Sequence, residues 1–389
     1  MEKTFMKIFG SSSDSLQPKL FFAPGRVNLI GEHTDHEGGF VFPCAINLGI
    51  EALVSRRDDD LIRLYSMNFD EGIFTPFEIK IDEVKTKSEF RSWVNYPLGV
   101  VYVLKKHGYK FGGADILFNG NLPGGAGLSS SAAIEVLTGK IFSELFDLNI
   151  DGVTMAKFSQ EAENNFVGMN CGIMDQFAVS MGKKNNAVLL NCSTLEYSYS
   201  PLELENFKIV ITNSNVPHSL AGSEYNLRRQ QCEQALADIQ KIKKISCLCD
   251  LNLNDLDEVS FSIADPVNLK RARHAVSENA RAIRASQALK NGDLNLFGKL
   301  MNASHVSLRD DYQVTVPELD TLASLAWKFP GVIGSRMTGG GFGGCTVSIV
   351  ENNKVEEIIN SIGSEYEKLC GRKADFYVIE TSDGAKKIS

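Results

Sequence analysis

An α/β or α+β fold in two domains is what this amino-acid sequence predicts, and three observations support the prediction. The chain has 389 residues, more than a single hydrophobic core usually serves. Hydrophobic residues make up 43% of it and charged residues 23%, which is the composition of a soluble globular protein. Strand-like and helix-like patterns alternate along the chain, as they do where helices pack on sheets. The polar stretch 200–206 separates two halves, so we expect domains at residues 1–205 and 206–389.

The first half begins with strand patterns and continues with two amphipathic helices. Residues 40–65 cluster apolar and β-branched side chains, which predicts short strands. Apolar residues recur at helical spacing in 129–146, behind serines suited to an N-cap, and again in 154–168. Gly168 is expected to end the second helix. The apolar run AVLLNC at 187–192 predicts a buried strand.

The second half is richer in helix. Asp265 and Pro266 form an N-cap and a first turn for a long helix, and Gly292 follows its end. A strand, a helix and another strand then succeed one another near the C-terminus. The predicted elements are strands at 208–214, 345–350 and 375–380, and helices at 223–244, 265–293 and 354–370.

Charge, apolar runs and cysteines bear on the class of protein. The net charge is −8 and no run of basic residues is present, so a nucleic-acid partner is not expected. The first 15 residues lack the apolar stretch of a signal peptide, and the longest apolar run near the middle, at 98–104, is far too short to span a membrane. Eight scattered cysteines fit reduced thiols, and Cys247 and Cys249 lack the spacing of a zinc site. We therefore expect a cytoplasmic protein without a membrane partner.

One stretch near the N-terminus is a poor core element. FFAPGRVNLIGEHTDHEGG, residues 21–39 and called the polar segment below, starts apolar and ends in two glycines. Such a crowd of polar side chains between a strand and a glycine turn has no evident structural use. The side chains in question are Arg26, Asn28, Glu32, His33, Asp35, His36 and Glu37.

A second stretch, NLPGGAGLSSSAAIEV at 121–136, combines three glycines with serines that open a helix. The glycines let the backbone approach a ligand closely, and the free N–H groups and the helix dipole favour an anion there. Neither a Walker A motif nor G-x-G-x-x-G is present. A glycine-rich turn followed by an ordinary N-cap is the structural alternative, and the residues alone leave both open.

Two further stretches carry unusual residues. Five glycines stand between Gly339 and Gly344, so this segment either closes over a ligand or contacts another backbone closely. A tight crossover into the strand that follows is the structural alternative. In GMNCGIMDQFAVSMG, residues 168–182, Asp175 has apolar neighbours. Its carboxylate therefore needs a partner, which is either structural or, if it is a cation in a cleft, functional.

Together these stretches resemble the GHMP kinases, the family of galactokinase, homoserine kinase, mevalonate kinase and phosphomevalonate kinase. PGGAGLSSSAA at 123–133 is similar to the family's phosphate loop, and GGGFGG to its third motif. GRVNLIGEHTD at 25–35 resembles the narrower galactokinase signature, as do CGIMDQF and SEYNLRR. The resemblance implies the two-domain GHMP kinase fold. In that fold the N-terminal domain is like domain 2 of ribosomal protein S5, the C-terminal α+β domain is ferredoxin-like, and the active site lies in the cleft between them.

The resemblance also implies the reaction, which is transfer of the γ-phosphoryl group of ATP to the C1 hydroxyl of α-D-galactose. A hexose presents hydroxyls in several directions, which accounts for the crowded polar segment. Arg26 and Asp175 would face the anomeric hydroxyl, with Asp175 as the base that Arg26 keeps ionised. The implied sugar contacts are Glu32, His33, Asp35, the backbone of Gly172, and Tyr225.

ATP is the implied co-substrate and Mg²⁺ the implied cofactor. Ser131 and Glu163 would hold the ion, which prefers oxygen ligands. Trp93 resembles a residue at the base pocket, where it either stacks on adenine or belongs to the core. No partner besides galactose and ATP is implied, and we expect a monomer or a weak homo-oligomer. The implied nucleotide contacts are Pro123, Gly124, Gly125, Ala126, Gly127, Leu128, Ser129, Ser130 and Ser131, together with Trp93.

The sequence departs from the family's pattern at two positions. His36 and Glu37 stand where the family usually has Tyr-Asn, which leaves the sugar range open. His36 is either a pocket residue or an exposed one. Two hypotheses compete with a galactose kinase: a kinase of N-acetylgalactosamine, galacturonate or arabinose, and a galactose sensor that transfers nothing. The intact phosphate loop and Asp175 disfavour the sensor.

Overall fold

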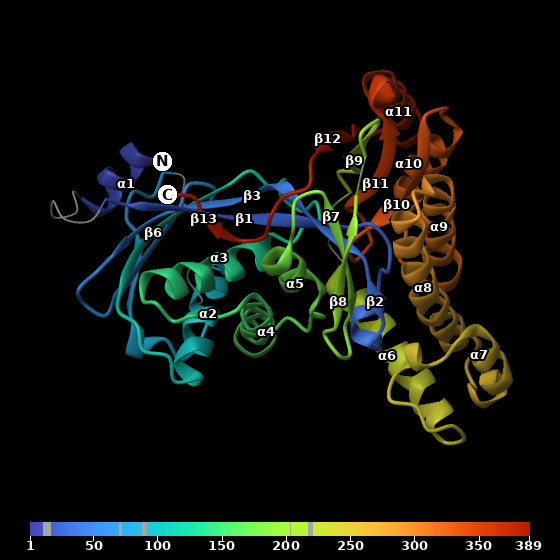
Figure 1. Ribbon diagram of the computed structural model, residues 1–389, viewed down its shortest axis with the longest axis horizontal. Helices are drawn as coiled ribbons and strands as arrows, with labels where there is room; N and C mark the ends of the chain where they lie inside the picture. The colour runs from blue at the N-terminus through green and yellow to red at the C-terminus, as the bar shows by residue number, and fades with distance from the viewer. Residues whose placement is uncertain (11–16, 70–71, 88–91, 203, 217–220) are drawn as a thin grey trace.

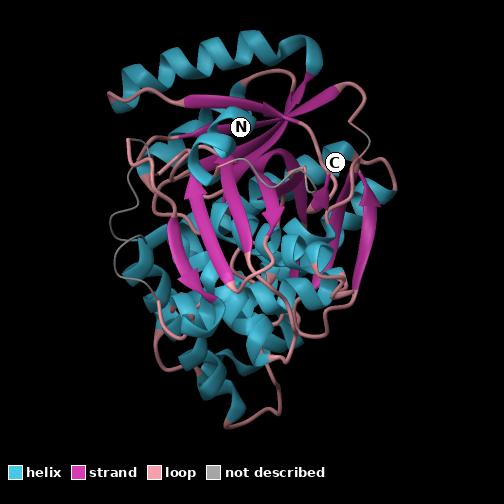
Figure 2. Cartoon of the chain, turned by 90° about the vertical axis from the view of Figure 1, so that its left-hand side faces the viewer, coloured by secondary structure: helices cyan, strands magenta, loops and turns pink. Residues whose placement is uncertain are grey.

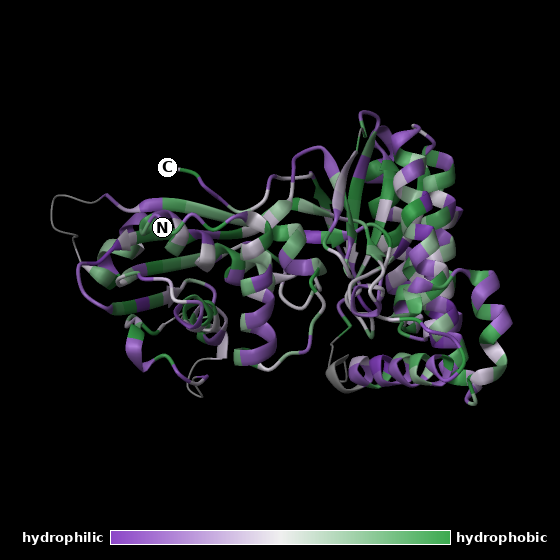
Figure 3. Cartoon of the chain, turned by 60° about the horizontal axis from the view of Figure 1, so that its bottom comes forward, coloured by the Kyte–Doolittle hydropathy of each residue, from purple (hydrophilic) through white to green (hydrophobic). Residues whose placement is uncertain are grey.

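The molecule combines sheets and helices in separate layers. Figure 1 shows a sheet of long strands towards one end and a second sheet backed by long helices at the other. Strands lie over helices (Figure 2), and the helices carry both hydrophobic and hydrophilic residues (Figure 3), as the sequence patterns predict. The computed structural model describes residues 1–10, 17–69, 72–87, 92–202, 204–216 and 221–389.

The larger sheet has six strands in the order β13-β1-β3-β6-β4-β5. Neighbouring strands are antiparallel except β4 and β6, which are parallel. Helices α2 to α5 lie along one face of this sheet (Figure 1), and a core that includes Phe118, Leu137 and Phe142 fills the space between them. The elements are β1 (Lys19–Asn28), β3 (Pro43–Arg56), β4 (Leu61–Ser66), β5 (Phe77–Lys80), β6 (Ala114–Gly120), β13 (Lys386–Lys387), α2 (Asn95–Lys106), α3 (Ser130–Leu145), α4 (Gly152–Glu161) and α5 (Met174–Met181).

A small sheet in the order β2-β7-β8 lies between the two larger ones (Figure 1). Its strands contact β3 of the first half and α8 of the second, so it joins the two halves. The strands are β2 (Phe40–Val41), β7 (Asn186–Asn191) and β8 (Tyr197–Pro201).

The second half is built on an antiparallel sheet in the order β10-β11-β9-β12. Long helices pack against it, and apolar residues such as Ile211, Phe297 and Val347 form the core between them. The elements are β9 (Phe207–Asn213), β10 (Val332–Thr338), β11 (Cys345–Glu351), β12 (Asp375–Ile379), α6 (Ala221–Gln240), α7 (Leu253–Val259), α8 (Pro266–Lys290), α9 (Leu294–Ser307), α10 (Pro317–Lys328) and α11 (Val355–Cys370).

Both chain ends lie against the larger sheet. Helix α1 (Glu2–Phe9) buries Phe5 and Ile8 against Leu53, Tyr65 and Leu117 of the strands. At the other end, β13 pairs with β1, so the last residues of the chain return to the first half. The division at 205/206 stays a prediction.

The sequence patterns differ from the structure mainly at element ends. The helix predicted at 154–168 is α4 followed by a π-helix at Ala162–Val167, and Gly168 ends it with a φ of 86°. The apolar run 98–104, for which no helix or strand is predicted, lies inside α2. Within the described residues no helix is long and apolar enough to cross a membrane. Short helical turns lie at Asp35–Glu37, Ile81–Glu83, Ser92–Val94, Leu248–Asp250, Ser260–Ser262, Leu308–Tyr312 and Asn352–Lys354.

Candidate active site

A cavity of about 730 Å³ collects residues from all the stretches that the sequence singles out. The polar segment, the phosphate loop, the region of Asp175, helix α6 and the glycines of 339–341 all contribute to its walls. Segments from the two halves of the chain therefore meet around one space large enough for small-molecule ligands. The candidate residues that line it are Arg26, Glu32, His33, Asp35, Gly125, Gly127, Glu163, Gly172, Asp175 and Tyr225.

Backbone constraints fix the shape of the polar segment. Gly31 has a φ of 99°, and a Cβ added there would lie 2.8 Å from the carbonyl oxygen of Phe40, so only glycine fits. Its N–H donates to Glu278 Oε1 at 2.9 Å. The Thr34 hydroxyl bonds the carbonyl oxygens of Gly31 and Phe40 at 2.9 and 2.8 Å. The turn that carries the candidate sugar ligands is therefore rigid before any ligand arrives.

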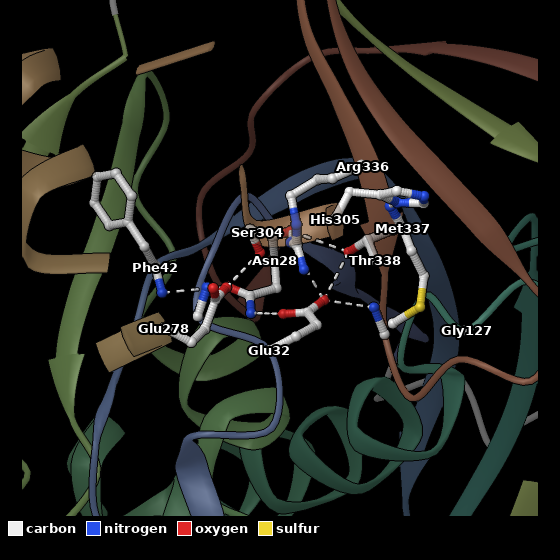
Figure 4. A network of polar contacts seen from close by, with 12 residues as sticks. Asn28, Glu32, Phe42, Gly127, Glu278, Ser304, His305, Arg336, Met337 and Thr338 are labelled. Atoms are coloured by element: carbon white, nitrogen blue, oxygen red, sulfur yellow. Dashed lines mark hydrogen bonds and ion pairs between the residues drawn. The ribbon is translucent and has the colours of Figure 1, made fainter. Parts of the chain in front are cut away.

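Glu32 joins this turn to the glycine-rich segment (Figure 4). Its Oε1 accepts hydrogen bonds from the Gly339 N–H at 2.5 Å and the Thr338 hydroxyl at 3.2 Å, and Arg336 Nη1 lies 3.6 Å away. Its Oε2 accepts from Asn28 Nδ2. Burial raises the pKa of Glu32, and the Arg336 guanidinium opposes that rise. Glu32 lines the cavity, but protein groups already bind both of its oxygens.

His33 is the neighbouring side chain, and it has an unused nitrogen. Only 5% of the residue is exposed, and among the described residues its Nε2 has no hydrogen-bond partner. Burial holds the pKa of His33 well below its usual value, so the imidazole is neutral. The Tyr312 and Tyr225 rings lie 4.6 and 5.6 Å from the imidazole ring, between centroids. A buried ring nitrogen without a partner is suited to a ligand hydroxyl.

Arg26 and Asp175 form a bidentate ion pair at the cavity. Arg26 Nε and Nη2 donate to the two Asp175 oxygens, both at 2.8 Å, and the Ser129 hydroxyl donates to Oδ2 at 2.6 Å. Arg26 Nη1 donates to the carbonyl oxygen of Gly127 at 2.7 Å. The Arg26 side chain is 5% exposed and that of Asp175 is 28% exposed, so the carboxylate is the partner that reaches solvent. Strand β1, the phosphate loop and α5 are locked together at this point.

Two glycines of the phosphate loop are required by its backbone rather than by its packing. Gly125 and Gly127 have φ values of 68° and 69°, yet a Cβ added to either would meet nothing within 4 Å. Ala126 and Leu128 alternate with them and are buried in the core, which anchors the loop. Ser129 precedes α3 and makes no side-chain cap, because its hydroxyl binds Asp175. The first N–H groups of α3 therefore lack a side-chain cap, which suits an anion.

Glu163 and Ser131, the predicted Mg²⁺ ligands, lie beside each other. Glu163 is buried on the π-helix and lines the cavity, and the Ser131 hydroxyl hydrogen-bonds its carboxylate. Gln176 Nε2 donates to Glu163 Oε2 at 2.6 Å and to Glu135 Oε2 at 3.3 Å. Burial and the Asp175 carboxylate raise the pKa of Glu163. A hydroxyl and a carboxylate fit Mg²⁺, which usually takes few protein ligands and completes its shell with phosphate and water.

Asp35 and Gly172 are in close contact across the cavity wall. A Cβ added to Gly172 would lie 1.8 Å from Asp35 Oδ2, so the carboxylate sits where a side chain would be. The other oxygen, Oδ1, accepts from the backbone N–H and Nδ1 of His36 at 3.0 and 3.1 Å. The His36 side chain is only 3% exposed, so the alternative of an exposed histidine is wrong. The Tyr225 hydroxyl lies 3.4 Å from His36 Nδ1.

Trp93 lies in the hydrophobic core. It is 8% exposed, packs edge-on against Phe118 with ring centroids 6.0 Å apart, and has Phe69 parallel to it at 6.5 Å. It does not line the cavity described above. Among the two uses that the sequence leaves open for Trp93, the packing favours the core.

Several residues of the site were missed by sequence reasoning. Arg336 and Thr338 stand in the glycine-rich stretch that the sequence singles out, but their contacts with Glu32 depend on how two distant segments meet. Glu135 and Gln176 stand in quoted motifs, yet helical periodicity predicts only that such residues lie on a face. No local pattern in the sequence could have found the pairing of Gln176 with Glu163.

Comparison with known proteins agrees with this geometry. The model of the galactokinase galactose-binding signature matches residues 3–56, the GHMP kinase N-terminal domain 95–183, and the GHMP kinase C-terminal domain 285–368. A crystal structure of mevalonate kinase superposes with a TM-score of 0.62 at 19% identity. The match covers 94% of this chain and 99% of that one, which supports the GHMP kinase fold. The predicted two-domain GHMP kinase fold is thereby confirmed, and the protein is an ATP-dependent sugar kinase.

Relatives of higher sequence identity show which GHMP kinases the chain resembles. Curated galactokinases of Clostridium beijerinckii and Bacillus subtilis are 52% and 48% identical to the chain, over 100% and 99% of its length and 98% and 97% of theirs. The crystal structure of Lactococcus lactis galactokinase complexed with galactose has a TM-score of 0.95 at 42% identity, covering 99% of this chain and 98% of that one. The chain belongs to the galactokinase family.

Proposed function

We propose that the protein transfers the γ-phosphoryl group of ATP to the C1 hydroxyl of α-D-galactose. The observation that carries the proposal is the Arg26–Asp175 pair, through which the polar segment contacts the phosphate loop in one cavity. A phosphoryl donor on the loop and a sugar on the polar segment would meet at this pair. Full-length similarity to galactokinases supports galactose as the acceptor.

The sugar is held in the part of the cavity lined by the polar segment. Within the part of the chain that the structure describes, His33 Nε2 is buried without a hydrogen-bond partner and Asp35 Oδ2 accepts no hydrogen bond. Both atoms are therefore free to bind hydroxyls. Tyr225 closes the same region from α6. Glu32 acts mainly by holding the turn in place, because its oxygens are bound by Thr338, Gly339 and Asn28.

The nucleotide lies at residues 123–131 of the phosphate loop. Positive-φ glycines and the start of α3 present backbone N–H groups to its phosphates. Ser131 and Glu163 would hold Mg²⁺, which neutralises charge on the transferring phosphoryl group when it is bound.

Asp175 accepts the proton of the C1 hydroxyl. Its bonds to two nitrogens of Arg26 fix the direction of the carboxylate, and the 28% exposure of its side chain leaves an edge accessible. Arg26 in turn steadies the negative charge that develops on the phosphoryl oxygens. The O–P bond to galactose forms as the bond to ADP breaks, and the proton goes to Asp175.

Three finer properties belong to the same proposal. The domain boundary lies near 205/206, the protein is a monomer or weak homo-oligomer, and it works in the cytoplasm. All eight cysteines are free, which fits a reducing compartment.

A panel of sugars with ATP and Mg²⁺ tests the proposal. ADP release is followed by a coupled assay with galactose, N-acetylgalactosamine, galacturonate, arabinose and glucose. We expect the highest kcat/KM for galactose. A higher value for one of the other sugars would reassign the substrate, and binding of galactose without any ADP release would favour a sensor.

A further inference from the structure

His36 lies between two carboxylates of its own turn, Asp35–Glu37. Its Nδ1 is 3.1 Å from Asp35 Oδ1, and its Nε2 is 3.5 Å from Glu37 Oε1. The side chains of His36 and Glu37 are only 3% and 4% exposed. Two nearly buried carboxylates this close together would repel each other, and a protonated imidazole between them offsets this electrostatic repulsion.

The remaining neighbours of His36 come from two other elements. The Tyr312 hydroxyl is 3.3 Å from Nε2, and the Tyr225 hydroxyl is 3.4 Å from Nδ1. Helix α6 also brings Arg229, whose charge opposes protonation of His36 but is paired with Glu233 at 3.1 Å. The titratable and charged groups that face the imidazole are therefore Asp35, Glu37, His33, Tyr225, Arg229 and Tyr312.

The two carboxylate oxygens of Asp35 have different partners. His36 binds Oδ1 twice, through its backbone N–H and through Nδ1. Oδ2 lies against Gly172, which lines the main cavity together with Asp35, and no described residue donates to this oxygen. A second cavity of about 390 Å³ is also lined by Asp35 and by His36, so packing alone does not hold the carboxylate in place. The direction of Oδ2 depends on the His36 contact.

Resting on the proposed function, we infer that His36 is a positioning residue: protonated, it holds Asp35 towards the sugar, and the affinity for galactose falls when the imidazole loses its proton. His36 acts on the sugar only through Asp35, because His36 itself does not line the main cavity.

The electrostatics give the direction of the pH effect. Burial lowers the pKa of His36, but the Asp35 and Glu37 carboxylates outweigh it and the pKa is raised above 6.5. Burial raises the pKa of Asp35, but the bonds from His36 outweigh it and the pKa is lowered below 3.8. The charged pair is therefore present below the pKa of His36 and is lost as the pH rises through it. A neutral Nδ1–H bond replaces it, which is the weaker kind.

The test is the pH dependence of the Michaelis constant for galactose from pH 5.5 to 9, at saturating ATP and Mg²⁺, with the dissociation constant followed by calorimetry. We expect the wild-type KM to rise about five- to tenfold across the titration of His36, the ratio between a charged and a neutral hydrogen bond. His36→Gln keeps a donor but cannot titrate, so its KM should be flat with kcat within about twofold. Glu37→Gln removes one carboxylate, so the rise should begin at lower pH.

A matched control is His107→Gln. His107 Nε2 lies 2.8 Å from Glu161, so it is also a histidine–carboxylate pair, but it is on the surface outside the cavity. Its KM profile should follow the wild type. A wild-type KM that is flat over the range, or an unchanged rise in His36→Gln, would overturn the inference. If galactose binds with the expected pH dependence but no ADP is released, the inference stands and the proposed function fails. If galactose does not bind at any pH, both fall.

Discussion

Replacing Asp175 by asparagine separates chemistry from binding at the centre of the site. The amide has the shape of the carboxylate, but it cannot accept the hydroxyl proton as a base. Asp175 now receives two bonds from Arg26 at 2.8 Å and one from Ser129 at 2.6 Å. An amide oxygen can keep one Arg26 bond, whereas the amide nitrogen faces a second donor of the same guanidinium.

The structure sets the size of two separate effects. Loss of a general base typically lowers a rate by about 10²–10⁴-fold, so we expect kcat to fall by that amount. Loss of one charge-assisted bond to the nearly buried Arg26 should lower the free energy of unfolding by about 1–3 kcal/mol. Both ligands should still bind, because His33, Asp35 and the phosphate loop are unchanged.

The assay combines steady-state kinetics, calorimetry for galactose and for ATP, and urea unfolding. Asp115→Asn is the matched control, because Asp115 is also a buried carboxylate held by arginines: Arg63 at 2.6 Å through two nitrogens and Arg57 at 3.2 Å. Asp115 lies outside the cavity, so the Asp115→Asn variant should be less stable than the wild type but have an unchanged kcat. A kcat within about tenfold of wild type for Asp175→Asn would refute the base assignment.

Three further predictions follow from backbone geometry and burial. Gly127→Val places a branched residue at a φ of 69°, so the KM for ATP should rise at least about tenfold with the fold intact by circular dichroism; an unchanged KM would move the nucleotide elsewhere. Gly172→Ala puts a Cβ where Asp35 Oδ2 now lies, so the KM for galactose should rise about tenfold while that for ATP stays the same; equal changes in both would contradict a sugar-specific role. Burial alone raises the pKa of Glu278, but Arg281 and other cations outweigh it and lower the pKa to about 2. Its contribution to stability, at most about 3 kcal/mol, should be lost as the pH falls from 5 to 2, so the loss of stability measured by unfolding over this range should be smaller in Glu278→Gln; an equal loss in both proteins would contradict the assignment.

The sequence predicts the parts of the site that short motifs encode. Arg26, Ser129 and Asp175 stand in three separate motifs, and the structure brings them into one hydrogen-bonded group. Each of these features needs a binding partner: the guanidinium of Arg26, the glycine-rich loop and the Asp175 carboxylate among apolar residues. The family resemblance identifies those partners. The adjacency of Ser131 and Glu163 follows from the same resemblance.

What the sequence could not predict depends on contacts between distant segments. The burial of His36 is set by Tyr312 and Tyr225, which lie in other elements, so the local sequence leaves exposure open. The break of the predicted helix 154–168 into α4 and a π-helix has no signal in the periodicity, since apolar residues continue at helical spacing through Phe166. The pairing of β13 with β1 involves only two residue pairs, too few to leave a pattern.

The most direct test of the central claim is the identity of the phosphorylated product. The purified protein is incubated with ATP, Mg²⁺ and uniformly ¹³C-labelled galactose, and the mixture is followed by ³¹P and ¹³C NMR. We predict one equivalent of ADP for each α-D-galactose 1-phosphate, identified by coupling between phosphorus and the anomeric carbon. Phosphate on another carbon, or ADP formed together with free phosphate and unchanged galactose, would contradict the account.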